Sequence, residues 1–328
     1  GCNRNGALIL DNVGYPHISF TCNEELKYAY WDGNNWQIQT VEYEETASIS
    51  ALGISLALDR SGYPHMSYIT LRDDPAIDRY SLHYVYKDAG EWSAQIIKTW
   101  GGLSPGRTSI TVDGGGCPHI SYLEVYDIVK DFGNLMYMYK DASGWQFDLV
   151  DSASYSGELK LDKDWEPHIL YRTYYPGGYS YAYHDVEGWH IQQLFDDLSL
   201  NGWVLDSEGF PHFALVEDGE LIYFYLDSAG WHFETLWEAW SWVDLVLDDF
   251  GFPHLSYMTV DGLKYTFREE AGWQYQSVSR ETPISNWRLY LDGNGDPHIC
   301  FQDRFGNVKY AHNMGEFEPT FLPLVLKR

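Results

Sequence analysis

Apolar residues along this chain gather in short segments that alternate with polar stretches containing glycine and proline. The apolar segments are rich in Val, Ile, Tyr, Phe and Trp and show no period of 3.6 residues, as in the stretches 54–58, 120–123 and 145–150. Short β-branched and aromatic runs bounded by turn residues predict strands rather than helices. We therefore expect an all-β protein.

One turn sequence joins two such segments again and again. In the copy Asp59-Arg60-Ser61-Gly62-Tyr63-Pro64-His65, Asp can bond its own backbone, Gly can adopt positive φ, and Pro stands at the first position of a strand. Copies recur every 42 to 54 residues, a period that indicates an array of supersecondary units. The seven copies begin at Asp11, Asp59, Asp113, Asp162, Asp206, Asp248 and Asp292.

Each copy is followed by a third apolar segment, such as 26–30, and by a second turn that ends on Trp, such as Asp141-Ala142-Ser143-Gly144-Trp145. A fourth segment starts at that Trp. Four antiparallel strands in each of seven units predict a seven-bladed β-propeller. An open β-solenoid is the alternative, but its units hold one or two strands.

The repeats run through the chain without a linker, so we expect one domain. The expected blades are residues 7–43, 52–99, 107–151, 156–196, 200–237, 242–279 and 286–326.

The net charge of −27 narrows the choice of partners. Nucleic acids and anionic membrane surfaces need basic patches, so neither is expected as a partner. A neutral or cationic partner fits better. No cofactor is expected, although a divalent cation such as calcium is a candidate. No apolar run reaches the roughly 18 residues of a membrane span.

The four cysteines suggest an oxidising compartment. Cys2 precedes the first strand of the first hairpin and Cys22 follows its second strand, so the two ends meet and a Cys2–Cys22 disulfide is predicted. Cys117 and Cys300 lie inside the repeat and are expected to be small buried side chains. Gly1-Cys2 also matches the remnant of a bacterial lipoprotein cleavage site. We expect an extracytoplasmic protein, secreted or at the cell surface, with a lipid anchor on Cys2 as one option.

The repeat pieces Pro118-His119-Ile120-Ser121-Tyr122 and Leu26-Lys27-Tyr28-Ala29 resemble a repeat of bacterial and archaeal cell-surface propeller proteins. The Asp-x-x-Gly-Trp turn is similar to the Asp-box of sialidase-like propellers, without the usual Ser before the Asp and Thr before the Trp. The resemblance implies the fold and little about activity, because this fold carries lectins, hydrolases, lyases and scaffolds. A sialidase-like site would need three arginines and a Tyr–Glu pair, and no such set can be assigned.

A histidine follows Pro in every copy of the first turn, which raises the question of a metal site. Zinc needs three or four ligands that converge on one point, whereas one histidine per blade lies on a ring. We expect each histidine to bond across its hairpin, often to the repeat Asp, and to hold the turn. The seven are His17, His65, His119, His168, His212, His254 and His298.

Positions where single copies depart from the repeat are the candidates for function. Four residues before the repeat Asp, three copies carry the charged residues Glu158, Asp244 and Arg288, expected near the mouth of the channel. They form either an acid–arginine network or a ligand site. The other candidate ligand-binding residues, on the rim that carries the divergent loops, are Arg172, Tyr174, Tyr175, Trp203, Trp242 and Trp287.

Acids, arginines and aromatic rings around one concave mouth suit a sugar. We expect a binding module whose partner is a glycan or another cell-surface molecule. One alternative is a glycan-cleaving enzyme, a lyase or hydrolase, that uses Glu158, Asp244, Arg172 and His83 as acid, base and charge-stabilising groups. A structural cell-surface or assembly protein is the other.

Overall fold

The structure is a computed structural model, and it describes residues 2–22, 25–43, 48–71, 80–88, 90–100, 106–127, 132–174, 177–195, 200–280, 285–302 and 308–312. The chain divides into two compact units, unit 1 with residues Gly1–Asp196 and unit 2 with residues Asp197–Arg328. The division falls between the fourth and fifth expected blades. Whether the chain acts as one domain stays a prediction. Strands form all the regular structure of the described residues, which contain no helix.

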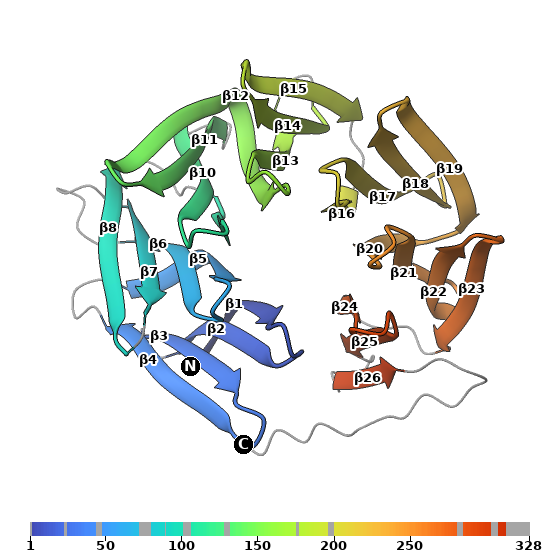
Figure 1. The fold of residues 1–328 in the computed structure, drawn as a ribbon, viewed down its shortest axis with the longest axis horizontal. Coiled ribbons are helices and arrows are strands. Elements are labelled where there is room, and N and C mark those ends of the chain that lie inside the picture. The colour runs from blue at the N-terminus through green and yellow to red at the C-terminus, as the bar shows by residue number, and fades with distance from the viewer. Residues whose placement is uncertain are drawn as a thin grey trace. The chain divides into compact units, whose positions relative to one another are not determined.

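Unit 1 is built from antiparallel strands that pair in sequence order (Figure 1). Two sheets have four strands each, β1–β4 and β5–β8, and a third has seven, β9–β15. The strands are β1 (Cys2–Leu10), β2 (Pro16–Cys22), β3 (Glu25–Trp31), β4 (Trp36–Tyr43), β5 (Ser48–Leu58), β6 (Pro64–Leu71), β7 (Tyr80–Lys87), β8 (Trp92–Trp100), β9 (Ser109–Val112), β10 (Pro118–Asp127), β11 (Phe132–Asp141), β12 (Gly144–Leu161), β13 (Pro167–Thr173), β14 (Tyr179–Asp185) and β15 (Gly188–Phe195).

The seven-stranded sheet joins two expected blades through one long strand. The first part of β12 pairs with β11 and its second part pairs with β13, and Ser154 faces a partner on each side. The expected break between residues 151 and 156 is therefore not an end of β12, because Asp151 and Ser154 within it have ladder partners.

Unit 2 has two four-stranded sheets, β16–β19 and β20–β23, and the three described strands β24–β26. Its strands are β16 (Leu200–Leu205), β17 (Pro211–Glu217), β18 (Glu220–Asp227), β19 (Gly230–Glu238), β20 (Ser241–Leu247), β21 (Pro253–Thr259), β22 (Gly262–Glu269), β23 (Gly272–Ser279), β24 (Ser285–Leu291), β25 (Pro297–Gln302) and β26 (Val308–His312). The fourth strand of the last expected blade lies outside the described residues.

The first hairpin turn of every sheet is built in the same way. In the turn after β5, the Asp59 carboxylate accepts hydrogen bonds from the backbone N–H groups of Ser61 and Tyr63, at 2.8 and 2.9 Å. Gly62 adopts φ of +80° and its N–H donates to the Asp59 carbonyl. The sequence prediction of an Asp-based turn with a glycine at positive φ is confirmed.

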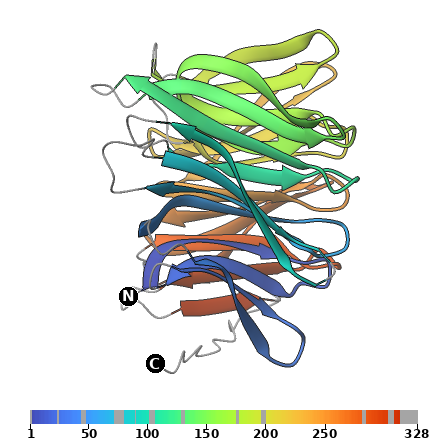
Figure 2. The same cartoon turned by 90° about the vertical axis from the view of Figure 1, so that its left-hand side faces the viewer.

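Each four-stranded meander has three turns, and the first and third lie at the same edge because successive strands run in opposite directions (Figure 2). We call this edge, with the Asp-x-x-x-x-Pro-His turns, the turn edge. The opposite edge, where one sheet leads to the next, is called the link edge.

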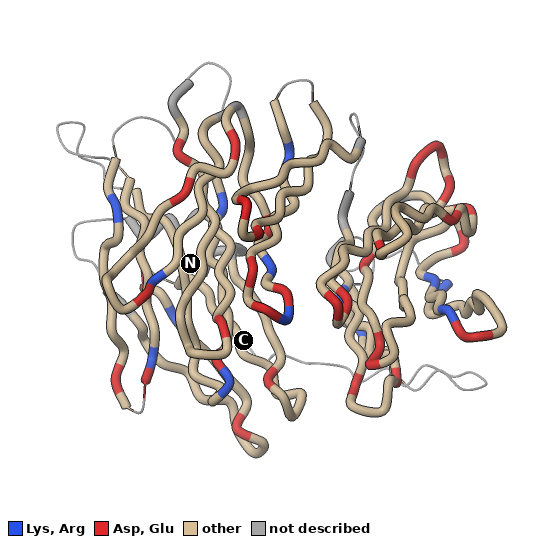
Figure 3. The backbone as a smooth tube through the Cα atoms, turned by 45° about the horizontal axis from the view of Figure 1, so that its top comes forward, with Lys and Arg blue, Asp and Glu red and all other residues tan. Residues whose placement is uncertain are grey.

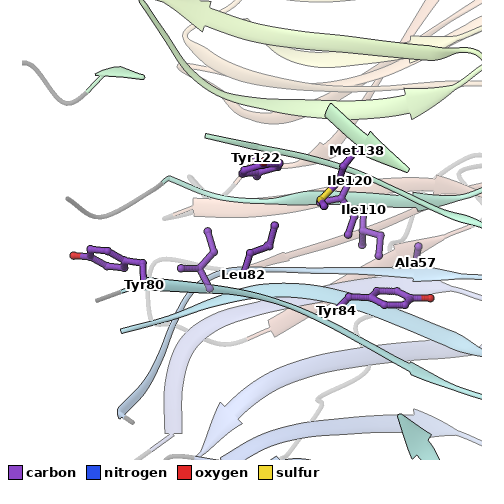
Figure 4. Close-up of a cluster of buried hydrophobic side chains, with 9 residues drawn as sticks. Ala57, Tyr80, Leu82, Tyr84, Ile110, Ile120, Tyr122 and Met138 are labelled. Atoms are coloured by element: carbon purple, nitrogen blue, oxygen red, sulfur yellow. The ribbon is translucent and has the colours of Figure 1, made fainter. Parts of the chain in front are cut away.

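Successive sheets within each unit bury their faces against one another. Between the second and third sheets of unit 1, Leu82 and Tyr84 on β7 pack with Ile110 on β9, Ile120 on β10 and Met138 on β11 (Figure 4). Leu82, Ile120 and Met138 are fully buried. A comparable cluster in unit 2 joins Leu255 and Tyr257 on β21 to Tyr223 on β18.

Tryptophans that end the second turn pack against a tyrosine of the preceding repeat. The rings of Trp92, Trp145, Trp189 and Trp273 lie edge-on to Tyr28, Tyr84, Tyr137 and Tyr223, with centroids 5.3–5.4 Å apart. Such edge-to-face pairs contribute roughly 0.5–1.5 kcal/mol beyond burial. Each tryptophan thus fastens its repeat to the one before it, and Trp189 does so within the seven-stranded sheet.

Candidate functional site

The repeat histidines are structural parts of the turn edge. His212 Nδ1 lies 2.5 Å from the hydroxyl of Tyr223, and its Nε2 lies 3.4 Å from Oδ2 of Asp206. The same Asp–His–Tyr chain occurs seven times, with Nε2 to Oδ2 distances of 3.4–4.0 Å. The tyrosine partners are Tyr28, Tyr84, Tyr137, Tyr181, Tyr223, Tyr265 and Tyr310. The prediction that the histidines bond across their hairpins is confirmed.

Burial shifts the titration of most of these histidines. It lowers the pKa of six of them below the ordinary value, and the neighbouring Asp only partly offsets this effect. Burial therefore favours the neutral form of these six histidines. Among the described residues, no group of three or more His, Cys, Asp or Glu side chains is arranged to hold a metal ion.

The residue four positions before the repeat Asp accepts a hydrogen bond from the first strand of the next repeat. The Ser55 hydroxyl accepts a hydrogen bond from the Ile110 N–H at 3.1 Å, and the Ser109 hydroxyl accepts one from the Leu159 N–H at 3.0 Å. Asp244 does the same in unit 2, where its carboxylate accepts from the Leu289 N–H at 2.8 Å. Asp244 therefore has a structural role, and a role in ligand binding stays a prediction.

The other two charged candidates at this position are exposed. Glu158 lies in unit 1 and its carboxylate pairs with Lys160 at 2.9 Å. Arg288 lies in unit 2 and donates to the Trp287 carbonyl at 3.2 Å. Arg288 lowers and Asp244 raises the pKa of Tyr290, which burial raises overall, so both act on the same phenol.

Three predicted site residues are buried. Trp203 is 4% exposed and stacks on Phe213, and Trp287 is 6% exposed and donates its indole N–H to the Ser256 carbonyl. His83 is 1% exposed, stacks on Tyr68 and hydrogen-bonds the Thr70 hydroxyl at 2.9 Å. The structure gives these residues packing roles, and their contact with a ligand or substrate stays a prediction.

Arg172 lies in an aromatic cluster at the link edge of unit 1. Its guanidinium is 5.9 Å from the ring centroid of Tyr155 and 5.8 Å from that of Tyr179. Tyr174 is 37% exposed and lies 6.4 Å from Tyr155, centroid to centroid. The predicted pair of Arg172 and Tyr174 is thus brought together, whereas Tyr175 lies outside the described residues.

Unit 2 exposes tryptophans at its own link edge, where β19 leads to β20. Trp240 is 67% and Trp242 is 65% exposed, and Trp237 is 37% exposed and packs against Tyr275 at 5.4 Å. Trp242 also has φ of +26°, in a region that L-residues rarely adopt. Of the predicted tryptophans, Trp242 is the one that can meet a ligand in this structure.

A cavity of about 410 Å³ lies at the turn edge of unit 1, where no site was predicted. Trp165 and Arg60 line it together with residues from the turns after β1, β5 and β9. The sequence did carry a signal. Asp162-Lys163-Asp164-Trp165 has Trp where the other six turns have Gly.

Acidic residues dominate the charge of both units, 48 Asp and Glu against 21 Lys and Arg in the whole chain (Figure 3). Cys22 is disulfide-bonded and its partner in the β1–β2 register is Cys2, as expected for a Cys2–Cys22 bridge. Cys117 and Cys300 are free, but the expectation that they are buried is wrong, because Cys117 is partly exposed and Cys300 is exposed. In the part of the chain that the structure describes, no helix is long and apolar enough to span a membrane.

No family model matches the chain, and no curated protein matches it by sequence. Solved structures do match by fold. The lectin SapL1 in complex with α-methyl fucoside has a TM-score of 0.51, with 87% of this chain and 98% of that chain covered at 10% identity. The polysaccharide lyase Uly1 has a TM-score of 0.57, with 91% and 86% covered at 10% identity.

Virginiamycin B lyase from Staphylococcus aureus has a TM-score of 0.53, with 92% of each chain covered at 10% identity. At these identities the likeness shows the fold alone. Together with the antiparallel sheets of four strands, it assigns the chain to the all-β propeller class.

Proposed function

We propose that this chain is a seven-bladed propeller that binds glycans through aromatic and charged residues at the link edge of each unit. The observation that carries the proposal is the exposure of Trp240 and Trp242, 67% and 65%. Large apolar rings that remain in water cost free energy unless a partner covers them, and the faces of sugar rings stack on tryptophan.

The Arg172 cluster gives a second set of groups of the same kind. The Arg172 guanidinium lies within 6 Å of two tyrosine ring centroids, and Arg172 remains exposed, so it can donate hydrogen bonds. Hydroxyl groups of a sugar accept such bonds, and exposed Tyr174 supplies an apolar face beside them. Two of the similar structures, the fucoside-bound lectin and the polysaccharide lyase, are named for carbohydrate ligands or substrates, which supports the same class of ligand.

Extracytoplasmic location is part of the proposal. A disulfide at Cys22 is typical of oxidising compartments. The disulfide and a lipid anchor on Cys2 exclude each other, because both use the same sulfur atom.

The test is a glycan array with the full chain, followed by calorimetric titration of the glycans that bind. Trp242→Ala and Arg172→Ala should each weaken binding by about 1–3 kcal/mol with an unchanged melting temperature. Phe250→Ala is the matched control, since Phe250 is 86% exposed in a turn at the opposite edge of unit 2 and should have no effect.

Full-strength binding by both link-edge variants would disprove the link-edge site. Incubation of the same glycans with catalytic amounts of protein separates binding from cleavage. New reducing ends or unsaturated products would make the chain an enzyme rather than a binding module.

A further inference from the structure

We infer that the cavity at the turn edge of unit 1 is a second binding site, built to hold one uncharged sugar ring against Trp165. The site is separate from the link-edge residues proposed above. Its volume of about 410 Å³ falls in the range of small-molecule pockets. Its walls come from the turns after β1, β5, β9 and β12, so four successive hairpins shape it.

Trp165 is the residue that sets this turn apart from the other six. Its φ is +68°, while the glycines at the same place have φ of +80° to +91°. The turn keeps its hydrogen bonds, with Trp165 N–H donating to the Asp162 carbonyl at 3.1 Å and Glu166 N–H to the Asp162 carboxylate at 2.9 Å. A bulky residue in a left-handed conformation is strained, and such strain concentrates at binding sites. Glycine would suit the turn better, so the indole needs a reason other than folding.

Arg60 and Gly114 place the indole. The Arg60 guanidinium lies 5.2 Å from the centroid of the Trp165 ring. Arg60 comes from the turn after β5 and Trp165 from the turn after β12, so the pair spans the turn after β9 that lies between them in sequence. Gly114 in that turn leaves the space, because a Cβ there would lie 2.5 Å from Trp165 and 2.7 Å from Arg60. Residues from three turns thus hold the indole of Trp165, and Trp165 is 38% exposed.

The remaining polar groups select an uncharged ligand with many hydroxyl groups. Asp11, Asp59 and Asp113 are among the lining residues, with side chains about one fifth exposed, and their carboxylates also accept the backbone hydrogen bonds of their own turns. Three carboxylates against the single cation Arg60 repel a uronate, sialate or phosphate. Sugar hydroxyls can donate to the carboxylates and accept from Arg60, while the ring covers Trp165 and the nearby Ile9.

The experiment uses the full chain and methyl glycosides of neutral hexoses and of fucose, with methyl glucuronoside as the charged counterpart. Binding is followed by saturation-transfer NMR and titration of tryptophan fluorescence. At least one neutral glycoside should bind, and Trp165→Gly should raise its Kd at least tenfold with the melting temperature unchanged or higher. Gly114→Ala should also weaken binding, because the added methyl displaces the Arg60–Trp165 pair.

Two controls separate this site from the link-edge site. Tyr63→Ala removes an aromatic ring that is equally exposed, 38%, and lies in the turn after β5. Tyr63 does not line the cavity, so this change should leave the Kd unchanged. Trp242→Ala should leave it unchanged as well. The inference is overturned if no neutral glycoside binds, if the charged glycoside binds more tightly, or if only Trp242→Ala abolishes binding. Full-strength glycan binding by both Trp242→Ala and Arg172→Ala would sink the proposed function and leave this site standing.

Discussion

The turns at Asp162 and Asp206 have the same backbone hydrogen bonds and the same Asp–His contact, yet they differ at the position three residues after the Asp, where the backbone is left-handed. The Asp206 turn has Gly209 at φ of +91°, and the Asp162 turn has Trp165 at +68°. The first turn needs nothing beyond its own geometry. The second tolerates a strained indole and presents it to a cavity. In this chain the repeated residues therefore stabilise the fold, while the residues that depart from the repeat mark the candidate sites.

Acid should produce the largest loss of stability, because it protonates the histidine in many copies of the repeat turn. Burial lowers the pKa of six repeat histidines in the folded state, whereas in the unfolded chain they titrate near the ordinary value of about 6.5. The unfolded state then binds more protons, so stability is fully present above about pH 6.5 and is lost as pH falls below it.

Each such histidine can remove at most about 1.4 kcal/mol per pH unit, and the six contributions add. Urea unfolding between pH 7.5 and 5.5 measures the loss. A free energy of unfolding that stays constant over this range would contradict the role given to the Asp–His–Tyr chains.

The next effect isolates one turn that follows the repeat. His212→Ala leaves the buried Tyr223 hydroxyl and the Asp206 carboxylate without their partner, and should cost roughly 1–3 kcal/mol. His184→Ala is the control, because His184 lies outside the repeat and makes a partly exposed pair with Glu166 worth at most about 1 kcal/mol. Binding by folded His212→Ala protein should be normal. Lost binding at an unchanged melting temperature would show that the histidine acts on a ligand.

The repeat made the turn edge predictable because its residues act locally. Asp59 and Gly62 form their turn within a few residues, and the contact between His65 and Asp59 spans the same hairpin. The tyrosine that completes each chain was not predicted, since it stands on the third strand at a distance of 11 to 19 residues that varies with the intervening loop. The local sequence pattern therefore predicted the turn but not the tyrosine that the histidine contacts on the third strand.

The candidate sites were predicted less well because they depend on which face a side chain meets. Trp203, Trp242 and Trp287 all lie on the first strands of their repeats, yet Trp242 is exposed whereas Trp203 and Trp287 are buried. The cavity beside Trp165 joins residues from four turns, more than 100 residues apart. The alternation of apolar and polar residues along one strand does not show which turns come together in space. The replacement of the repeat glycine by Trp165 was visible in the sequence.

A substitution at the link edge tests whether a departure from the repeat always marks function. Asp244 accepts a backbone hydrogen bond as Ser55 and Ser109 do, so Asp244→Ala should cost about 1 kcal/mol. Asp244→Ser should restore that bond and most of the stability. Thermal melting gives the stability and the glycan titration gives the binding. If Asp244→Ser is as unstable as Asp244→Ala, the carboxylate does more for the fold than the serines do.

The smallest expected effect has the opposite sign and returns to the two turns compared above. Trp165→Gly removes a left-handed conformation that costs about 1–2 kcal/mol, but also the cation–π contact with Arg60, worth about 0.5–1 kcal/mol at an exposed site. The net result should be a gain of roughly 0.5–1 kcal/mol in the free energy of unfolding, measured by urea denaturation. The reverse change, Gly209→Trp, imposes the same conformation without an Arg partner in place and should cost about 1–2 kcal/mol. If Trp165→Gly instead destabilises the chain, the indole contributes to the fold more than its strain removes, and the strain can no longer count as a sign of binding.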